Sequence, residues 1–157
     1  MHATHDDSVG DDTRQHVDDL RLAARGDAQA QFRLSYAARE MVVSGEADEI
    51  VASMEGLTYA RLAASQGVPD ALLLAADHCS HLAKVYSDCG ADDCANDWAG
   101  QAIGLLEIAT DLLPASNAAE LMQTLNTAAD MATPEIMALA KYYRAAFAPA
   151  FGAAAFA

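Results

Sequence analysis

The sequence predicts an all-α protein of about seven helices, arranged as antiparallel helical hairpins that stack into a short α/α solenoid. Its 157 residues are enough for one domain with a buried core. Hydrophobic residues make up 53% of the chain and aromatic residues only 6%, so much of the apolar content is alanine, the strongest helix former. Apolar residues recur at helical spacing, no segment alternates like a strand, and breaks of about two to seven residues are too short for crossover connections.

The chain is expected to divide into three parts. Residues 1–12 are rich in aspartate and lack apolar periodicity, which predicts a disordered acidic segment. Residues 13–148 carry the helical pattern and form the helical-repeat domain, and residues 149–157 form an apolar tail. Pro149 and Gly152 are expected to stop the last helix at this tail.

Two interpretations of the tail stay open. It is either a frayed end or a short peptide whose Phe151 and Phe156 dock on the same or a neighbouring protomer, because exposed aromatic side chains are costly in water. In the second case the C-terminal tail would allow a homo-oligomer.

The first helix is expected over residues 13–25. We expect Val17, Leu20 and Ala24 to face inward, because they recur at helical spacing. Asp18 and Asp19 are then left on the solvent side. The later helices are expected at about residues 28–43, 47–66, 69–86 and 95–113, followed by a sixth capped by Ser116 and Asn117 and a seventh that begins at Thr133 to Glu135.

A similar helix-ending pattern occurs twice along the chain. An Ala-Ala pair shortly before Gly26 closes one helix, and a second pair shortly before Gly67 closes another, with 41 residues between the two glycines. A separation of this size is typical of helix-pair repeats. Both glycines are expected in the left-handed conformation, which glycine adopts without strain. Gly45 is instead expected in a longer, more adaptable loop.

The residues around these glycines resemble the Sel-like repeat family, a relative of the tetratricopeptide repeat. The stretch Gly26–Leu34 is similar to the family's glycine turn and first-helix signature, and Tyr59–Gly67 is similar to the end of its second helix. The resemblance covers about one and a half repeats, within about residues 20–67. It implies a curved α/α solenoid used for protein contacts and assembly, with no family-wide catalytic residues.

The net charge bears on the class of partner. With 23 acidic and 9 basic residues the formal charge is -14, which would repel a nucleic-acid backbone or an anionic membrane surface. We therefore expect neither nucleic acid nor membrane as a partner. The N-terminus shows no secretory signal and the three cysteines are not a disulfide framework, so we expect a cytoplasmic location.

No catalytic motif stands out in the sequence. A glycine-rich phosphate loop, an HExxH pair and a GxSxG elbow are all missing. The paired aspartates are sequence neighbours, which point in different directions on a helix. We therefore expect no enzyme activity and no cofactor.

The densest group of reactive side chains predicts an alternative function, a small metal-binding or metal-responsive protein. Thiolate and imidazole are the ligands that zinc prefers. The spacing matches no regular zinc motif, and the first cysteine lies on a predicted buried stripe while the histidines flank it. The candidate ligands are His78, Cys79, His81, Cys89 and Cys94.

The leading hypothesis is an adaptor that binds a peptide or a protein on its helical-repeat surface. The first helix of each hairpin lines the inner side of such solenoids. Phe32 fills the core position of its helix, and Arg33 and Tyr36 flank it; Tyr36 has an alternative interpretation as a core residue. The predicted partner-binding residues are Arg33, Tyr36, His78 and His81.

Overall fold

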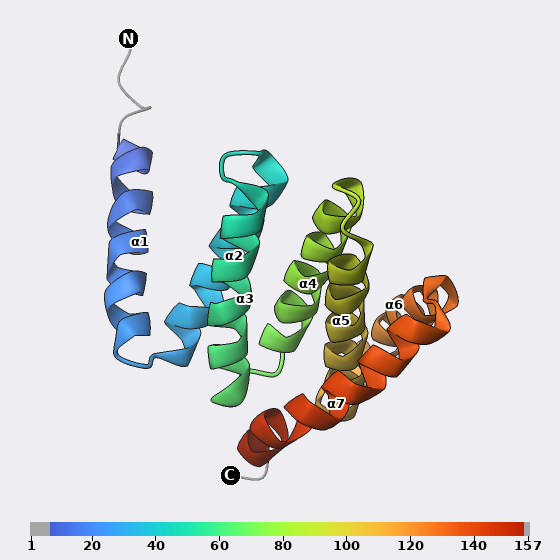
Figure 1. The fold of residues 1–157 in the computed structure, drawn as a ribbon. Helices are drawn as coiled ribbons and strands as arrows, with labels where there is room; N and C mark the ends of the chain where they lie inside the picture. Colours follow the sequence, from blue (N-terminus) through green and yellow to red (C-terminus); the bar gives the residue numbers. More distant parts are fainter. Residues whose placement is uncertain (1–6, 156–157) are drawn as a thin grey trace.

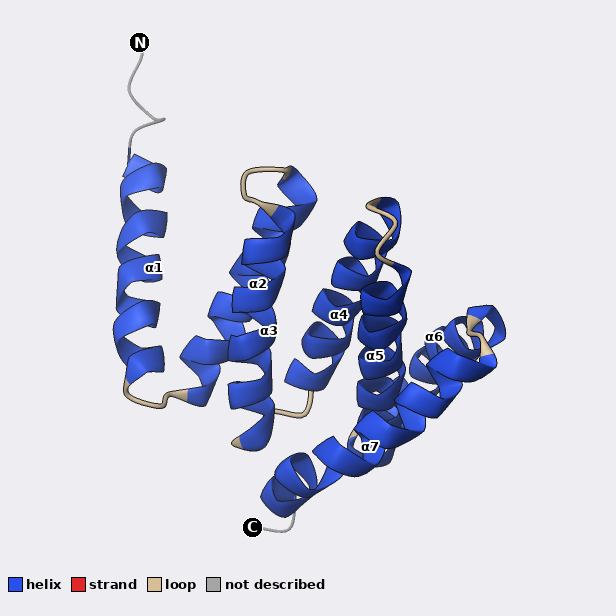
Figure 2. Cartoon of the chain, viewed as in Figure 1, coloured by secondary structure: helices blue, strands red, loops and turns tan. Residues whose placement is uncertain are grey.

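The structure, a computed structural model, describes residues 7–155, without the side chains of residues 7–9, 115–118 and 153–155. In that part of the chain every regular element is a helix (Figure 2). The elements are α1 (Asp7–Ala24), α2 (Ala28–Ser44), α3 (Glu49–Ser65), α4 (Ala71–Asp88), α5 (Asp92–Leu112), α6 (Ala115–Met131) and α7 (Pro134–Ala155). The predicted all-α architecture of stacked hairpins is confirmed.

Consecutive helices run in opposite directions and pack on one another from α1 to α6 (Figure 1). In this view α2 lies behind α3, and α6 lies behind α7. Helix α7 packs mainly on α5 and also reaches α3. The main apolar core joins α3, α4 and α5, and it includes Leu72, Leu82 and Leu105, each at most 1% exposed.

The repeat period is visible in the burial pattern of the first helices. Of the six buried residues of α2, all except Val42, which corresponds to the half-buried Ala83, have buried counterparts in α4 at a separation of 41 positions. These pairs are Ala30 and Ala71, Gln31 and Leu72, Leu34 and Ala75, Ser35 and Ala76, and Ala38 and Cys79. Helices α2 and α4 are therefore equivalent in consecutive hairpins.

Four glycines end helices in the same way. Gly26, Gly45, Gly67 and Gly90 all have positive φ, between 73° and 90°. At each one the glycine N–H and the next N–H donate back to carbonyls of the last helical turn, as in Gly67 to Ala64 at 3.1 Å. The expectation for Gly26 and Gly67 is confirmed. The expected contrast with Gly45 is wrong, because Gly45 has the same left-handed conformation.

Side-chain caps occur at some of the expected starts. Asp27 accepts the N–H of Ala30 at 2.7 Å, and Thr133 accepts the N–H of Ile136 at 3.2 Å. The predicted cap at Ser116 and Asn117 is wrong, because α6 already begins at Ala115, directly after Pro114.

Helix α1 departs from prediction in its length and in the face that it buries. It begins at Asp7, so residues 7–12 are helical; residues 1–6 lie outside the described residues. Val17 and Leu20 are 39% and 36% exposed, whereas Asp19 is 5% exposed. The predicted inward stripe is wrong because an ion pair fixes the rotation of α1: Arg33 of α2 donates to both carboxylate oxygens of Asp19.

The C-terminal tail also differs from prediction. Helix α7 continues through Pro149 to Ala155, so the expected stop is wrong. Tertiary contacts of α7 outweigh the helix-breaking tendency of Pro149 and Gly152. Phe151 is 4% exposed and belongs to the main core. Arg61 of α3 lies 4.2 Å from the ring centroid of Phe147. Phe151 therefore docks on its own chain, while Phe156 lies outside the described residues.

Two glycines let α7 approach α5 closely. A Cβ at Gly100 would lie 2.5 Å from Leu139 Cβ, and one at Gly104 would lie 2.9 Å from the carbonyl oxygen of Ala140. Beside them, Tyr143 donates a hydrogen bond to Asp97 at 2.6 Å. Burial and this bond raise the pKa of Tyr143 to about 12. The contact thus combines close backbone packing with a polar anchor.

We predict that Gly45→Ala and Gly67→Ala each lower the free energy of unfolding, by about 1–2 kcal/mol, because alanine is strained at positive φ. Urea denaturation of purified variants measures both. The control is Gly10→Ala, which lies in helix α1 with open space around the added Cβ and should not destabilise the protein. A large loss at Gly67 with none at Gly45 would contradict the shared geometry.

We also predict that Gly104→Ala destabilises the protein by about 1–3 kcal/mol, as overpacking does, because the new methyl group meets backbone atoms of α7. Gly152→Ala is the matched control, since a Cβ there meets nothing within 4 Å. Thermal unfolding followed by circular dichroism compares the two. Equal melting temperatures would show that α7 does not sit directly on Gly104.

Candidate functional site

Three cavities open along α4 and together form what we call the groove. The α2–α4 cavity, of about 280 Å³, is lined by Arg39, Ser53, Asp77, His78, His81 and Lys84 among others. The α4–α6 cavity, also about 280 Å³, includes Leu73, Ala76, Leu106, Glu120 and Thr124. The α4–α7 cavity, of about 320 Å³, includes Ala83, Ile103, Met131 and Ile136. Ser80 lines all three cavities, and Asp77 lines the first two.

A buried imidazole forms the inner wall of the α2–α4 cavity. His78 is 2% exposed, and its Nε2 lies 3.2 Å from both the hydroxyl and the carbonyl oxygen of Ser35. A carbonyl oxygen can only accept, so this contact places a proton on Nε2. The ring fills the space beside Gly56, where a Cβ would lie 2.3 Å from it. Burial lowers the pKa of His78, which favours the neutral ring.

The rim of the same cavity is charged. Arg39 Nε donates to Asp77 at 2.5 Å, and this hydrogen bond raises the pKa of the Arg39 guanidinium. Lys84 donates to Asp88 at 2.6 Å. The two cations of the rim are therefore already paired with carboxylates of this chain.

Two buried polar atoms of the cavity have no hydrogen-bond partner within the described residues. They are Ser53 Oγ and His81 Nε2. The nearest charged group to His81 Nε2 is Glu49, whose Oε2 lies 3.7 Å away. Both atoms are shielded from solvent, so they are not exposed to a ligand in the groove.

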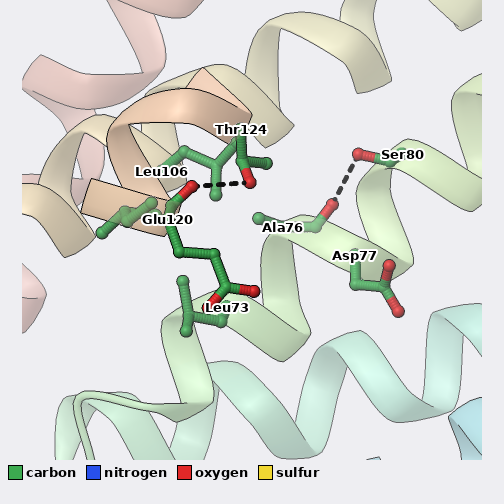
Figure 3. Close-up of a pocket in the computed structure, with 8 residues that line it drawn as sticks. Leu73, Ala76, Asp77, Ser80, Leu106, Glu120 and Thr124 are labelled. Atoms are coloured by element: carbon green, nitrogen blue, oxygen red, sulfur yellow. Dashed lines mark hydrogen bonds between the residues drawn. The ribbon is translucent and has the colours of Figure 1, made fainter. Parts of the chain in front are cut away.

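The α4–α6 cavity has an apolar floor and an acidic edge (Figure 3). Ser80 Oγ donates to the carbonyl oxygen of Ala76 at 2.9 Å, and Thr124 Oγ1 donates to that of Glu120 at 3.1 Å. The two hydroxyl groups therefore serve their own helices. The charged groups at its edge are the carboxylates of Asp77, which is paired with Arg39, and of Glu120.

The predicted partner-binding residues occupy different environments. Arg33 donates a hydrogen bond to the carboxylate of Asp19, and this bond lowers the pKa of Asp19. Tyr36 is 50% exposed, so its interpretation as a core residue is wrong. His78 is buried inside the wall, and His81 lies half-buried in the groove. Of the four, only the two histidines line the groove.

The sequence reasoning missed Arg39, Asp77 and Glu120. A usable signal existed for one of them, because Asp77 follows Tyr36 by 41 positions and so holds the equivalent place in the next hairpin. Because the repeat period is 41 residues, Asp77 has the same exposed position in α4 as Tyr36 has in α2. Glu120 had no such signal, since α6 does not follow the register of α2 and α4.

The candidate metal ligands do not converge. Cys79 is fully buried, which raises its pKa to about 12, while Cys89 and Cys94 are exposed free thiols. Within residues 7–155, no group of three or more His, Cys, Asp or Glu side chains is placed to hold a metal ion. The alternative of a metal site between His78 and Cys94 therefore has no geometric support in the described chain.

Comparison with known proteins gives no family for this chain. No protein-family model matches it, and neither a curated protein nor a solved structure does. In the part of the chain that is described, no helix combines the length and the apolar character needed to cross a membrane.

We predict that His78 makes the protein less stable as the pH falls below about 6.5, the ordinary imidazole pKa. Above this pH the ring is neutral in both states. Below it, the unfolded chain binds a proton that the folded protein resists, so the free energy of unfolding falls. Urea denaturation between about pH 7.5 and 5.5 measures the slope.

The variant His78→Gln should flatten this slope, whereas His81→Gln is the control and should keep it. A slope that is the same in wild type and His78→Gln would show that His78 does not carry the pH dependence.

Proposed function

We propose that this protein is a non-catalytic scaffold or adaptor of the Sel-like repeat type, which binds an extended segment of a partner protein in the groove. The 41-residue register of α2 and α4 and the shared glycine caps support the repeat assignment. The groove lies along the first helices of the hairpins, the side on which helical repeats bind their ligands.

The observation that carries the proposal is the meeting of three cavities at one exposed residue, Ser80. Each cavity has a volume of 280 to 320 Å³. This lies at the lower limit of pockets that enclose a small molecule, which measure about 300–1,000 Å³. A row of small adjoining cavities is suited to successive side chains of a peptide.

The edges of the groove add apolar surface to these cavities. Val43 at the α2–α4 cavity is 71% exposed, and Met131 at the α4–α7 cavity is 81% exposed. Large apolar side chains left in water beside a cavity favour a partner that covers them. Methionine in particular adapts to different partner surfaces because it is unbranched and flexible.

The proposal is tested by filling the junction of the cavities. We predict that Ser80→Arg abolishes or strongly reduces the capture of partner proteins from an extract of the source cells, because the long side chain occupies the groove without entering the core. Quantitative mass spectrometry of captured proteins measures the loss.

Thr58→Arg on α3 is the matched control. Thr58 is also an exposed hydroxyl residue in mid-helix, and its Oγ1 donates to the carbonyl oxygen of Met54 at 2.9 Å, as Ser80 does to Ala76. Both variants should keep the wild-type helical content. Equal recovery of the same partners by wild type and Ser80→Arg would overturn the proposal.

A further inference from the structure

We infer that the α4–α6 cavity is a subsite for one arginine or lysine side chain, so that the partner segment carries a basic residue at a fixed position. The inference rests on the proposed function and narrows the chemistry of its partner. It follows from the shape of the cavity, from its charges and from the charge of the whole chain.

The floor of the cavity suits the aliphatic part of a long basic side chain. Leu106 and Leu121 are buried at the base, and Leu73 is half-buried at the side. Lysine and arginine pack their methylene groups on such surfaces and keep the charged end in a polar environment. A cavity of about 280 Å³ holds one such side chain.

The edge of the cavity supplies a negative charge for the cationic end. Figure 3 shows the Glu120 side chain extending from α6 toward Leu73 on α4, across the opening between the helices. Within the described residues, no ion pair involves Glu120, whereas Asp77 is paired with Arg39. The cavity therefore carries one uncompensated carboxylate beside a neutralised one, which matches a single positive charge.

The rest of the protein favours the same occupant. The net charge of -14 attracts basic segments and repels acidic or phosphorylated ones at long range. The basic side chains near the groove do not offset this, because Lys84 and Arg39 are engaged by Asp88 and Asp77. An acidic ligand would have to displace these ion pairs.

A selection experiment tests the inference directly. A phage library of random peptides, each about 12 residues long, is selected on the full-length wild type, on Glu120→Lys and on Glu46→Lys. Glu46 lies exposed in the loop between α2 and α3 and lines none of the three cavities, so its variant makes the same change in net charge outside the α4–α6 cavity. We expect wild type and Glu46→Lys to enrich arginine or lysine at one position, and Glu120→Lys to enrich aspartate or glutamate there.

A synthetic peptide from the wild-type selection then gives the affinity. Fluorescence anisotropy should show that Glu120→Gln weakens binding by about fivefold, as the loss of a partly exposed ion pair does. Replacing the selected basic residue of the peptide by glutamine should weaken binding similarly. Combining this peptide with Glu120→Gln should weaken binding little further. Circular dichroism verifies that each variant keeps its helical content.

The outcomes separate this inference from the proposed function. Selected peptides that Ser80→Arg blocks, but that share no basic position, would support the groove and overturn the basic subsite. If Glu120→Lys still selects peptides with a basic residue at that position, the preference comes from the net charge of the protein rather than from Glu120, and the subsite is overturned as well. If no peptide is enriched on the wild type, both the groove and the subsite are rejected.

Discussion

The imidazole of His78 fixes how α2, α3 and α4 meet. It extends from α4, hydrogen-bonds to Ser35 of α2 and fills the space beside Gly56 of α3, so one side chain sets three helix positions. A buried polar group of this kind requires its partners, because leaving it unsatisfied costs about 1–3 kcal/mol. The spacing of α2 and α4, and with it the width of the α2–α4 cavity, depends on this contact. Substitution of Gly56 or Ser35 would therefore alter the groove without touching its surface.

The parts of the fold that the sequence predicted correctly depend on local chemistry. Helical periodicity located the helices, and the glycines at 26 and 67 ended two of them because a positive φ is a property of the residue itself. The parts that it missed depend on contacts between distant residues. Asp19 is buried because Arg33 of another helix binds it, and α7 passes through Pro149 because Phe151 reaches the core. Neither partner is visible from the local pattern.

The groove was predictable to a smaller extent. Its general place on the first helix of each hairpin followed from the repeat architecture, and His81, one of the predicted contact residues, lines it. The pairing of Arg39 with Asp77 joins residues 38 positions apart, and the approach of Glu120 to Leu73 depends on how α6 lies against α5. Gly100 and Gly104 likewise show their role only when α7 is placed on α5. Helix-to-helix geometry, rather than residue type, decides these contacts.

The uneven distribution of the core along the solenoid has a consequence for how the protein moves. Helix α1 packs on α2 over a small apolar cluster of Ala23, Ala30 and Leu34, whereas α4 and α5 share the large one. In a linear array each helix is held mainly by its neighbours, so local opening has its lowest free energy where the neighbouring contact is smallest. The molecule should therefore loosen at α1 and at α6, whose contact with α5 is smaller still, while the hairpin of α4 and α5 stays closed. The α4 wall of the groove therefore belongs to the part that opens last, whereas the α6 wall that carries Glu120 belongs to a part that opens more readily.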